Sequence, residues 1–354
     1  MTDPTFLERL LDAPGPSGFE TRPARVWRGE AEGFADDVAV DLTGNSFATV
    51  NPDGHTRLML AGHIDEIGLQ VTHVDKEGYL WVEEIGGWDP QVLVGQRVRV
   101  LAEGGDVRAV VGKKPIHLMT PEDRKKELKT AHLWLDVGTS SREETLELGV
   151  RVGDAVTIAQ GMERLAGNRI VSRAVDDRVG AWVALEALRL LAADRPSASV
   201  TAVATVQEEI GYSGGGARAG AYALRPGVAL VVDVTFATDV PGTEKKALGD
   251  HALGSGPVIS RGAAAHGTVF TMLCETADQE GIPYSVQASP KATRTDADGI
   301  FLTRSGVPTG LLSIPNRYMH SPNEIVDLGD LEHTARLMAA FARRLESNTD
   351  FTPR

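Results

Sequence analysis

The sequence has a single cysteine and no long apolar run, and both absences narrow the classes of protein it can encode. Only Cys274 among the 354 residues carries a thiol, so no disulfide can form within the chain and we expect a reducing, cytoplasmic location. No segment approaches the roughly 20 consecutive apolar residues that a membrane-spanning helix needs. The opening MTDPTFLERLLDA contains three acidic side chains, so it predicts a short amphipathic helix rather than a secretory signal.

Basic side chains are also scarce relative to acidic ones. The 36 Lys and Arg residues stand against 49 Asp and Glu, which gives a formal net charge of -13. Such a surface repels nucleic-acid phosphates and anionic membranes, so we expect neither as a partner. Hydrophobic residues make up 42% and charged residues 24% of the chain, as is typical of folded proteins. A chain of this length exceeds one ordinary hydrophobic core and predicts about two domains.

The two ends of the chain read as one α/β domain. Short apolar and β-branched runs are typical of parallel strands buried on both faces. The stretch Val179–Ala193 places apolar residues along a broad helical face. We therefore predict a layered sheet with helices on both faces, formed by residues 1–69 and 168–354. The predicted strands are Leu58–Gly62, Val200–Val206, Val228–Val232 and Thr309–Ile314.

The middle of the chain has a different pattern. Between residues 70 and 167, valine-rich segments alternate with polar residues and are interrupted by glycines, which favours short antiparallel strands. Val98–Leu101 and Val107–Val111 flank Gly104 and Gly105 as a hairpin, and Pro121–Lys129 is a candidate short helix. We predict a small β-barrel inserted into the α/β domain. Its basic stretch, residues 113–129, is either a solvated loop or a loop that reaches a neighbouring subunit's site.

Polar residues follow several of the predicted strands. His63 and Asp65 follow the first strand, Asp233 ends the third, and His320 comes shortly after the fourth. Ligands of open α/β sheets bind at the carboxyl ends of strands, and a carboxylate such as Asp65 can fix the orientation of a metal-bound imidazole. Each residue alone is more often an ordinary loop residue, but together they predict one site.

Two pairs of adjacent acids add to this pattern. Glu208 and Glu209 follow the second strand, and burying both without a cation would cost on the order of several kcal/mol. Neighbouring residues point in different directions, so one can bind a metal while the other faces a reacting water. Asp176 and Asp177 precede the predicted helix; one suffices as its N-cap, and the other is available.

The charges of these residues favour two metal ions over one. Three carboxylates and two neutral imidazoles carry about -3, against about +4 for two zinc ions, and one shared hydroxide would bring the cluster near neutrality. Nitrogen and oxygen ligands of this kind suit zinc best, with cobalt or manganese as alternatives. The predicted metal ligands are His63, Asp176, Glu209, Asp233 and His320.

Seven ordered motifs across nearly the whole chain resemble the TET-type dinuclear metalloaminopeptidases, a family with members once labelled cellulase-M or endoglucanase-like. The resemblance implies an aminopeptidase that acts on peptides with free N-termini. It also implies an inserted β domain that mediates dimer contacts, and dimers that assemble into a tetrahedral homododecamer. The motifs are APGPSGFE from residue 13, AGHIDEIG from 61, DDRVG from 176, QEEIG from 207, DVT from 233, TDA from 295 and RYMHSP from 317.

Carried onto this sequence, the resemblance implies a role for each site residue. His63 and Asp233 would hold one metal, Glu209 and His320 the other, and Asp176 would bridge them. Glu208 would be the general base, and Asp65 would orient His63. Asp177 is not counted as a ligand. Phe236, Arg294 and Asp298 depart from the family's pattern, and Arg294 is either a specificity residue for acidic side chains or a surface ion-pair partner.

Three rival interpretations remain open from sequence. A carboxypeptidase or an N-deacylase on a similar dinuclear scaffold is the nearest, although a carboxypeptidase needs a cation to bind the substrate's carboxylate. A glycoside hydrolase using Glu208 and Glu209 would leave the histidines unexplained, and its carboxylates would flank a sugar bond at roughly 5 to 9.5 Å. A peptide-binding protein without turnover is disfavoured by the complete set of ligands and base.

Overall fold

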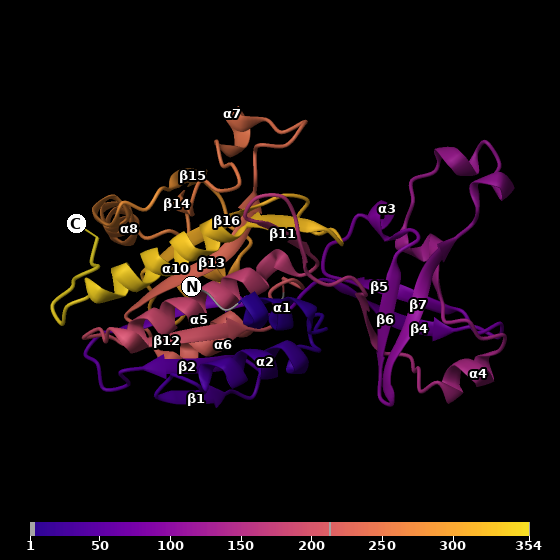
Figure 1. The fold of residues 1–354 in the computed structure, drawn as a ribbon, viewed down its shortest axis with the longest axis horizontal. Helices are drawn as coiled ribbons and strands as arrows, with labels where there is room; N and C mark the ends of the chain where they lie inside the picture. The colour runs from indigo at the N-terminus through magenta and orange to yellow at the C-terminus, as the bar shows by residue number, and fades with distance from the viewer. Residues whose placement is uncertain (1–3, 212–213, 354) are drawn as a thin grey trace.

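An eight-stranded sheet organises the larger part of the molecule in the computed structural model, which describes residues 4–211 and 214–353 (Figure 1). The strand order is β1-β2-β12-β3-β13-β16-β14-β15. The four central strands run parallel to one another, so their carboxyl ends lie at one edge. The strands are β1 (Asp37–Val40), β2 (Ser46–Val50), β3 (Arg57–His63), β12 (Ser199–Thr205), β13 (Val228–Phe236), β14 (Val258–Gly262), β15 (Ser285–Ser289) and β16 (Thr309–Asn316).

The central strands are apolar on both faces because helices cover both. In β3, Leu58 and Leu60 pack into the core on one face, while Met59 and Ala61 pack into a second core on the other. This explains why the sequence shows continuous apolar runs rather than an alternating pattern. The four predicted strands and the layered α/β fold are confirmed, and β13 continues three residues beyond Asp233.

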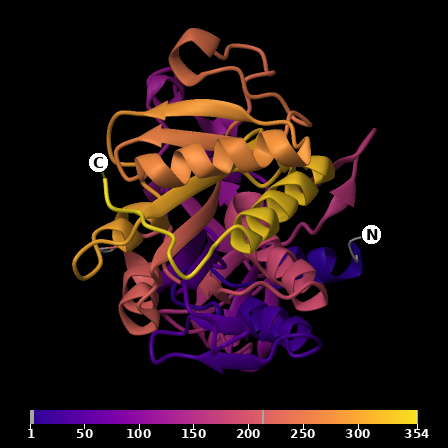
Figure 2. The same ribbon diagram turned by 90° about the vertical axis from the view of Figure 1, so that its left-hand side faces the viewer.

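Helices form the outer layers, and Figure 2 shows several of them stacked across one face of the sheet. The predicted helix Val179–Ala193 is the main part of α5, which packs against β3, β12 and β13. The predicted N-terminal helix is present over Pro4–Asp12. Residues 1–3 of the predicted segment lie outside the described residues. No helix in the described ranges has the length and apolarity needed to cross a membrane. On the α5 face lie α1 (Pro4–Asp12), α2 (Thr21–Ala31), α5 (Val175–Ala193), α8 (Gly267–Glu280) and α10 (Leu328–Arg343); on the other lie α6 (Gly215–Leu224) and α9 (Asp296–Phe301).

A closed six-stranded barrel stands beside this sheet, at the right of Figure 1. Its order is β4-β5-β8-β7-β6-β9, and it encloses a separate core of valines and leucines. The inserted β-barrel is confirmed, including the hairpin of β6 and β7. The expected helix Pro121–Lys129 is reduced to a three-residue 3₁₀ turn, η2. The elements are β4 (Gly68–Val74), β5 (Leu80–Ile85), β6 (Arg97–Ala102), β7 (Gly105–Lys113), β8 (Leu133–Asp136) and β9 (Ala155–Ile158), with α3 (Pro90–Leu93), α4 (Arg142–Glu147), η1 (Ile116–Leu118), η2 (Asp123–Lys125) and η3 (Thr130–His132).

Smaller elements complete the sheet domain. A three-stranded sheet has the order β10-β11-β17, and β17 leads directly into α10. This small sheet places the segment after β16 close to the start of α5, because β11 and β17 pair residue by residue. The remaining elements are β10 (Glu163–Arg164), β11 (Arg169–Ser172), β17 (Glu324–Asp327) and α7 (Lys245–Leu248).

Glu66 connects the sheet domain to the barrel. This buried carboxylate accepts hydrogen bonds from the Gly15 N–H and the Arg178 guanidinium, each at 2.9 Å, and from Arg173. It also accepts from the Thr157 hydroxyl of β9, at 3.2 Å. Burial would raise the pKa of Glu66, but the charges of Arg173 and Arg178 hold it below its usual value. The junction is therefore built around one ionised carboxylate.

Candidate metal centre

The carboxyl edge of the parallel strands brings the predicted site residues together. His63 is the last residue of β3 and pairs in register with Thr205 at the end of β12. Asp233 lies in β13 opposite Ser313 of β16. Glu209 follows β12, and His320 follows β16, so segments far apart in the chain meet at this edge.

The start of α5 separates the two adjacent aspartates. The peptide bond between Asp176 and Asp177 is cis, and both residues have non-helical φ and ψ angles. Asp177 accepts hydrogen bonds from the Gly180 N–H and the His63 N–H, each at 3.2 Å. Asp177 therefore caps the helix and fixes it to β3, while Asp176 turns towards the imidazoles.

Asp176 lies between the two histidines. Its Oδ1 is 3.1 Å from His63 Nε2, and its Oδ2 is 3.4 Å from His320 Nε2. Glu209 Oε2 lies 3.2 Å from the same nitrogen of His320. Two overlapping groups have ligand atoms within 4.8 Å of one another, one formed by His63, Asp177 and Asp233 and the other by His63, Asp176 and Glu209.

A close approach of two backbones sets the position of His63 relative to α5. A Cβ atom on Gly62 would lie 2.3 Å from the Gly180 carbonyl carbon and 2.5 Å from the Ala181 nitrogen. Non-bonded contacts of a Cβ atom are essentially never shorter than 3.0 Å, so only glycine fits at this position. The absence of a side chain lets β3 and the first turn of α5 touch.

Asp65 organises the floor of the site. Its carboxylate is fully buried, with Oδ1 3.4 Å from His63 Nδ1. It accepts hydrogen bonds from the Ser17 hydroxyl at 2.6 Å, the Glu208 N–H at 3.2 Å and the Glu209 N–H at 3.1 Å. One carboxylate therefore positions both an imidazole and the two adjacent glutamates.

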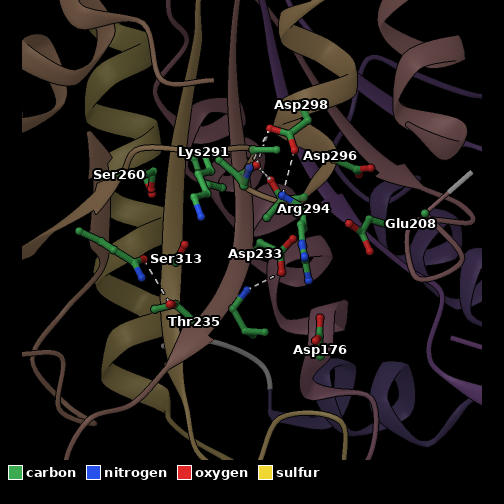
Figure 3. Close-up of a pocket in the computed structure, with 18 of the residues that line it drawn as sticks. Asp176, Glu208, Asp233, Thr235, Ser260, Lys291, Arg294, Asp296, Asp298 and Ser313 are labelled. Atoms are coloured by element: carbon green, nitrogen blue, oxygen red, sulfur yellow. Dashed lines mark hydrogen bonds between the residues drawn. The ribbon is translucent and has the colours of Figure 1, made fainter. Parts of the chain in front are cut away.

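The two adjacent glutamates point in different directions. The side chain of Glu209 is 5% exposed and contacts His320, whereas that of Glu208 is 14% exposed and lines the neighbouring cavity. Glu208 Oε2 is also 3.8 Å from His63 Nε2. Figure 3 shows Glu208, Asp233 and Asp176 around the same space.

The electrostatics of the cluster indicate that it is built to hold cations. Burial and then the neighbouring Asp176 raise the pKa of Glu209 to about 7. Burial, together with Asp233, raises the pKa of Glu208 to about 10 even though His63 opposes this. Burial opposes a charge on His320, yet Asp176 and Glu209 raise its pKa to about 11. Divalent ions would replace these shared protons, because ligand groups bind metal in their deprotonated forms.

The donor set fits divalent transition metals. It combines imidazole nitrogens with carboxylate oxygens, the ligand types that zinc, cobalt and manganese accept. Within the described residues, Glu209 Oε1 is buried and has no hydrogen-bond partner. An unpartnered carboxylate oxygen inside such a cluster is costly unless a cation binds it.

Two buried carboxylates near the cluster were not predicted from sequence. Glu324 accepts hydrogen bonds from the Asp176 N–H at 3.1 Å and the His320 N–H at 2.9 Å, so it positions both residues. Asp296 accepts from the Thr205 hydroxyl, and burial raises its pKa to about 6. The available sequence signals were the spacing of Glu324 four residues after His320 and the acid within the TDA motif.

A cavity of about 1170 Å³ opens beside the cluster (Figure 3). The clustered acidic and histidine side chains form one side, and the segment between β15 and α9 forms another. The fold and the site together define an exopeptidase-like enzyme of the α/β class. Residues 44–337 match the model of the M42 glutamyl aminopeptidase family. The chain therefore belongs to the M42 family of aminopeptidases, the family that contains the TET enzymes, and is a hydrolase of peptide bonds.

Individual relatives agree with this membership. The chain is 37% identical to the lysyl aminopeptidase of Pyrococcus furiosus, over the full length of both proteins. It superposes on the TET aminopeptidase of Thaumarchaeota archaeon SCGC AB-539-E09 with a TM-score of 0.91 and 34% identity, covering 97% of this chain and 96% of the other. The TET1 peptidase of Pyrococcus horikoshii matches with 32% identity and a TM-score of 0.84, over 96% of this chain and 99% of the other. That peptidase can assemble into a tetrahedron or a large octahedral shell.

Proposed function

We propose that this protein is an aminopeptidase that removes N-terminal residues from peptides by means of two divalent metal ions. Membership of the M42 family supports the activity. The observation that carries the dinuclear centre is the position of Asp176, whose two carboxylate oxygens each face a different imidazole. A single carboxylate placed in this way is suited to bridge two ions.

The ligands divide between the two ions as follows. His63 and Asp233 would hold one ion, Glu209 and His320 the other, and Asp176 both. The ligand atoms of His63, Asp176 and Glu209 lie within 4.8 Å of one another, which supports one shared centre, and the contact of Glu209 with His320 at 3.2 Å supports placing these two on the same ion. Zinc fits the donor set best, and cobalt or manganese would also be accepted.

The chain's own residues supply the proton transfers. When bound, the two ions would polarise the peptide carbonyl and lower the pKa of water. Glu208 faces the cavity beside His63, so it would take a proton from the attacking water and deliver one to the departing amine. Asp65 contacts both the backbone N–H of Glu208 and the imidazole of His63, so it fixes their positions relative to each other. Glu324 accepts hydrogen bonds from the backbone N–H groups of Asp176 and His320 and so holds both residues in place.

The geometry disfavours the glycoside hydrolase alternative. A glycosidase needs two carboxylates that both face the sugar bond. Here Glu209 contacts His320 and its side chain is only 5% exposed, so it is not free to act on a sugar bond together with Glu208. A carboxypeptidase or N-deacylase would use the same cluster, and only the choice of substrate separates these activities.

We also propose that the protein self-associates into dodecamers built from dimers. The assembly of the similar TET1 peptidase of Pyrococcus horikoshii supports this. In this proposal residues 70–167 form the dimerisation domain, and residues 1–69 and 168–354 form the catalytic domain. The separate core of the barrel supports such a division of roles.

The test is the variant Glu208→Gln in metal-loaded protein. It should retain two ions per chain and lose kcat on an aminoacyl p-nitroanilide by about 10²- to 10⁴-fold, because a general base is removed while the ligands stay. Glu209→Gln is the matched comparison, since the same change there should lower the metal content measured by elemental analysis. An N-acetylated substrate should resist the wild-type enzyme.

Two results would contradict the proposal. Full activity of Glu208→Gln would remove the general-base assignment. Equal rates on blocked and free N-termini would show that the enzyme is a deacylase or another exopeptidase rather than an aminopeptidase.

A further inference from the structure

The segment after β12 carries the two adjacent glutamates, and side chains from other parts of the chain hold its backbone. The pairing of β12 with β3 ends at Thr205, so the backbone N–H groups that follow need other acceptors. The four N–H groups of residues 206–209 all donate to side-chain oxygens. These bonds run from Val206 to Asn45 Oδ1 at 3.1 Å, from Gln207 to Glu20 Oε1 at 3.2 Å, and from Glu208 and Glu209 to the two oxygens of Asp65 at 3.2 and 3.1 Å.

Glu20 is the last residue of the APGPSGFE motif, which contains neither a proposed metal ligand nor the proposed base. Its side chain is buried, and its Oε1 also accepts a hydrogen bond from the Gly18 N–H at 2.7 Å. Gly18 has a φ of 86°, which glycine adopts without strain. The same motif contributes Ser17, whose hydroxyl donates to Asp65 at 2.6 Å. The motif therefore supports residues 206–209 directly through Glu20 and indirectly through Asp65.

The backbone of Gln207 is strained and depends on such support. Its φ of 61° lies in the left-handed region, which a residue other than glycine adopts only at a cost in free energy. A conformation of this kind persists only where the surrounding structure holds it. The hydrogen bond from the Gln207 N–H to Glu20 is one such contact, and it lies directly before Glu208.

Asn45 holds the residue on the other side of Gln207. Its buried amide accepts a hydrogen bond from the Val206 N–H and donates one to the Gly216 carbonyl at 2.9 Å. The Gly216 N–H in turn donates to the Val206 carbonyl at 2.7 Å. Val206 and Gly216 are therefore tied to each other and to Asn45, and Glu20 acts on the next residue along the chain.

Glu20 supplies a hydrogen-bond acceptor rather than a necessary negative charge. Burial, and then the charge of Asp65, raise the pKa of Glu20 to about 7. The carboxyl group therefore accepts a proton readily near neutral pH, and the carbonyl oxygen of the protonated acid still accepts a hydrogen bond from an N–H group. A neutral amide of the same length would provide the same acceptor.

We propose that Glu20 is a positioning residue for the general base, because its oxygen fixes the Gln207 N–H and so sets the direction in which the Glu208 side chain extends into the cavity. This inference rests on the aminopeptidase function proposed above, in which Glu208 transfers the proton. Displacement of a reacting group by about 1 Å can cost on the order of a hundredfold in rate.

The neighbouring Glu209 should depend less on Glu20. Its N–H donates to Asp65, and its side chain lies 3.2 Å from His320 Nε2, so it is held at both backbone and carboxylate. The side chain of Glu208 is 14% exposed and lines the cavity, so its direction depends more on its backbone. Loss of the acceptor at Glu20 should therefore impair proton transfer more than metal binding.

The experiment compares Glu20→Met with Glu20→Gln in the metal-loaded, full-length enzyme, on an aminoacyl p-nitroanilide. Glu20→Met removes the acceptor but keeps a side chain of similar length. It should lower kcat by about 10- to 100-fold and change KM by less than about twofold. Glu20→Gln keeps an acceptor oxygen and should retain kcat to within about threefold. Both variants should retain two ions per chain by elemental analysis.

A second background separates positioning of the base from a general structural role. In Glu208→Gln the base is already absent, so adding Glu20→Met should change the residual kcat by less than about twofold. Glu20→Ala provides the same comparison if the thermal midpoint shows that Glu20→Met does not fold. Glu8→Ala is the matched control: Glu8 is an exposed glutamate of α1, and its loss should leave kcat, KM and metal content unchanged.

The outcomes separate this inference from the proposed function. Wild-type kcat in a folded Glu20→Met variant, or an equal loss in Glu20→Gln, would overturn the role of the acceptor. A loss of bound metal, or an equal further loss of kcat in the Glu208→Gln background, would show that Glu20 does not act through the base. Without hydrolysis of any free aminoacyl amide by the wild type, the proposed function itself would be rejected, and Glu20 would have no base to position.

Discussion

At the residue scale, Glu66 forms two buried ion pairs, with Arg173 and Arg178, at the junction between the sheet domain and the barrel. It accepts hydrogen bonds from two arginines, a backbone N–H and a hydroxyl, with almost no exposure to solvent. Removing one partner of a buried ion pair leaves the other charge without compensation. The stability of the whole chain should therefore depend on this single carboxylate.

Glu66→Gln should lower the free energy of unfolding by about 3–5 kcal/mol, because it leaves the charges of Arg173 and Arg178 buried and unpaired. Chemical denaturation followed by fluorescence measures this change. Glu77→Gln is the matched control: the Glu77 side chain is 55% exposed, so its loss should change stability by no more than about 0.5 kcal/mol. Equal effects of the two substitutions would contradict the role of Glu66.

The same residue has a defined pH dependence. Its pKa in the folded protein lies below the ordinary value of 4.5. The folded state therefore gains stability from ionised Glu66 above pH 4.5, and this gain is lost as the pH falls towards the folded-state pKa. In acid, the stability of wild type and Glu66→Gln should converge.

The site residues differ in how far sequence alone could predict them. His63 and Glu209 follow apolar strands, so their place at the sheet edge was predictable, and the family motifs supplied their proposed roles. Asp233 was expected at the end of a strand but lies inside β13, because the strand extends along β16 to Phe236. Glu324 was missed because its function depends on hydrogen bonds to two backbone groups that only the folded chain brings near it.

At the scale of elements, the contact between β3 and α5 determines how the site is assembled. β3 ends with His63, and α5 begins next to Asp176, so two segments that carry proposed metal ligands meet where Gly62 touches Gly180. A side chain at Gly62 would collide with backbone atoms, which cannot rotate away. The elements would have to move apart, and the distance between His63 and Asp176 would increase.

Gly62→Ala should therefore destabilise the protein by at least about 1–3 kcal/mol and lower its affinity for metal. The thermal midpoint and a zinc titration measure the two effects. Gly29→Ala is the matched control: a Cβ at Gly29 meets nothing within 4 Å, and this exposed position in α2 should gain about 0.5–1 kcal/mol from alanine. A Gly62→Ala variant with wild-type metal affinity would contradict the proposed importance of this contact.

The elements themselves were largely predictable, and the exceptions have local causes. Strands buried on both faces and the long helix α5 follow from apolar runs and helical periodicity. The expected helix Pro121–Lys129 fails because its charged residues make other contacts. Lys114 and Lys126 each lie 3.1 Å from Asp123, which fixes a compact turn instead. Sequence periodicity carries no information about such ion pairs.

At the scale of the whole molecule, the barrel leaves apolar side chains in contact with solvent. Ile116 is 57% exposed and Leu118 is 69% exposed, and both lie in η1 after β7. Exposed apolar groups that lie close together favour association, because contact removes them from water. They are consistent with the proposed role of the barrel in dimer contacts.

We therefore expect the native mass in solution to correspond to twelve chains, measured by native mass spectrometry. The double variant Ile116→Asp with Leu118→Asp should shift the mass towards smaller species, because two charges would enter the contact. Circular dichroism should remain unchanged, since both side chains lie outside the barrel core. A wild-type protein that is monomeric and fully active would contradict the proposed assembly.

The wall of the cavity and the metal cluster come from different parts of the chain. Residues 290–295 line the cavity, whereas β3, α5, β13 and the segments after β12 and β16 carry the proposed ligands and the proposed base. Replacing side chains on a connecting segment leaves the packed sheet unaltered. Substitutions at these six positions can therefore alter the shape of the cavity while the residues proposed to bind metal stay the same.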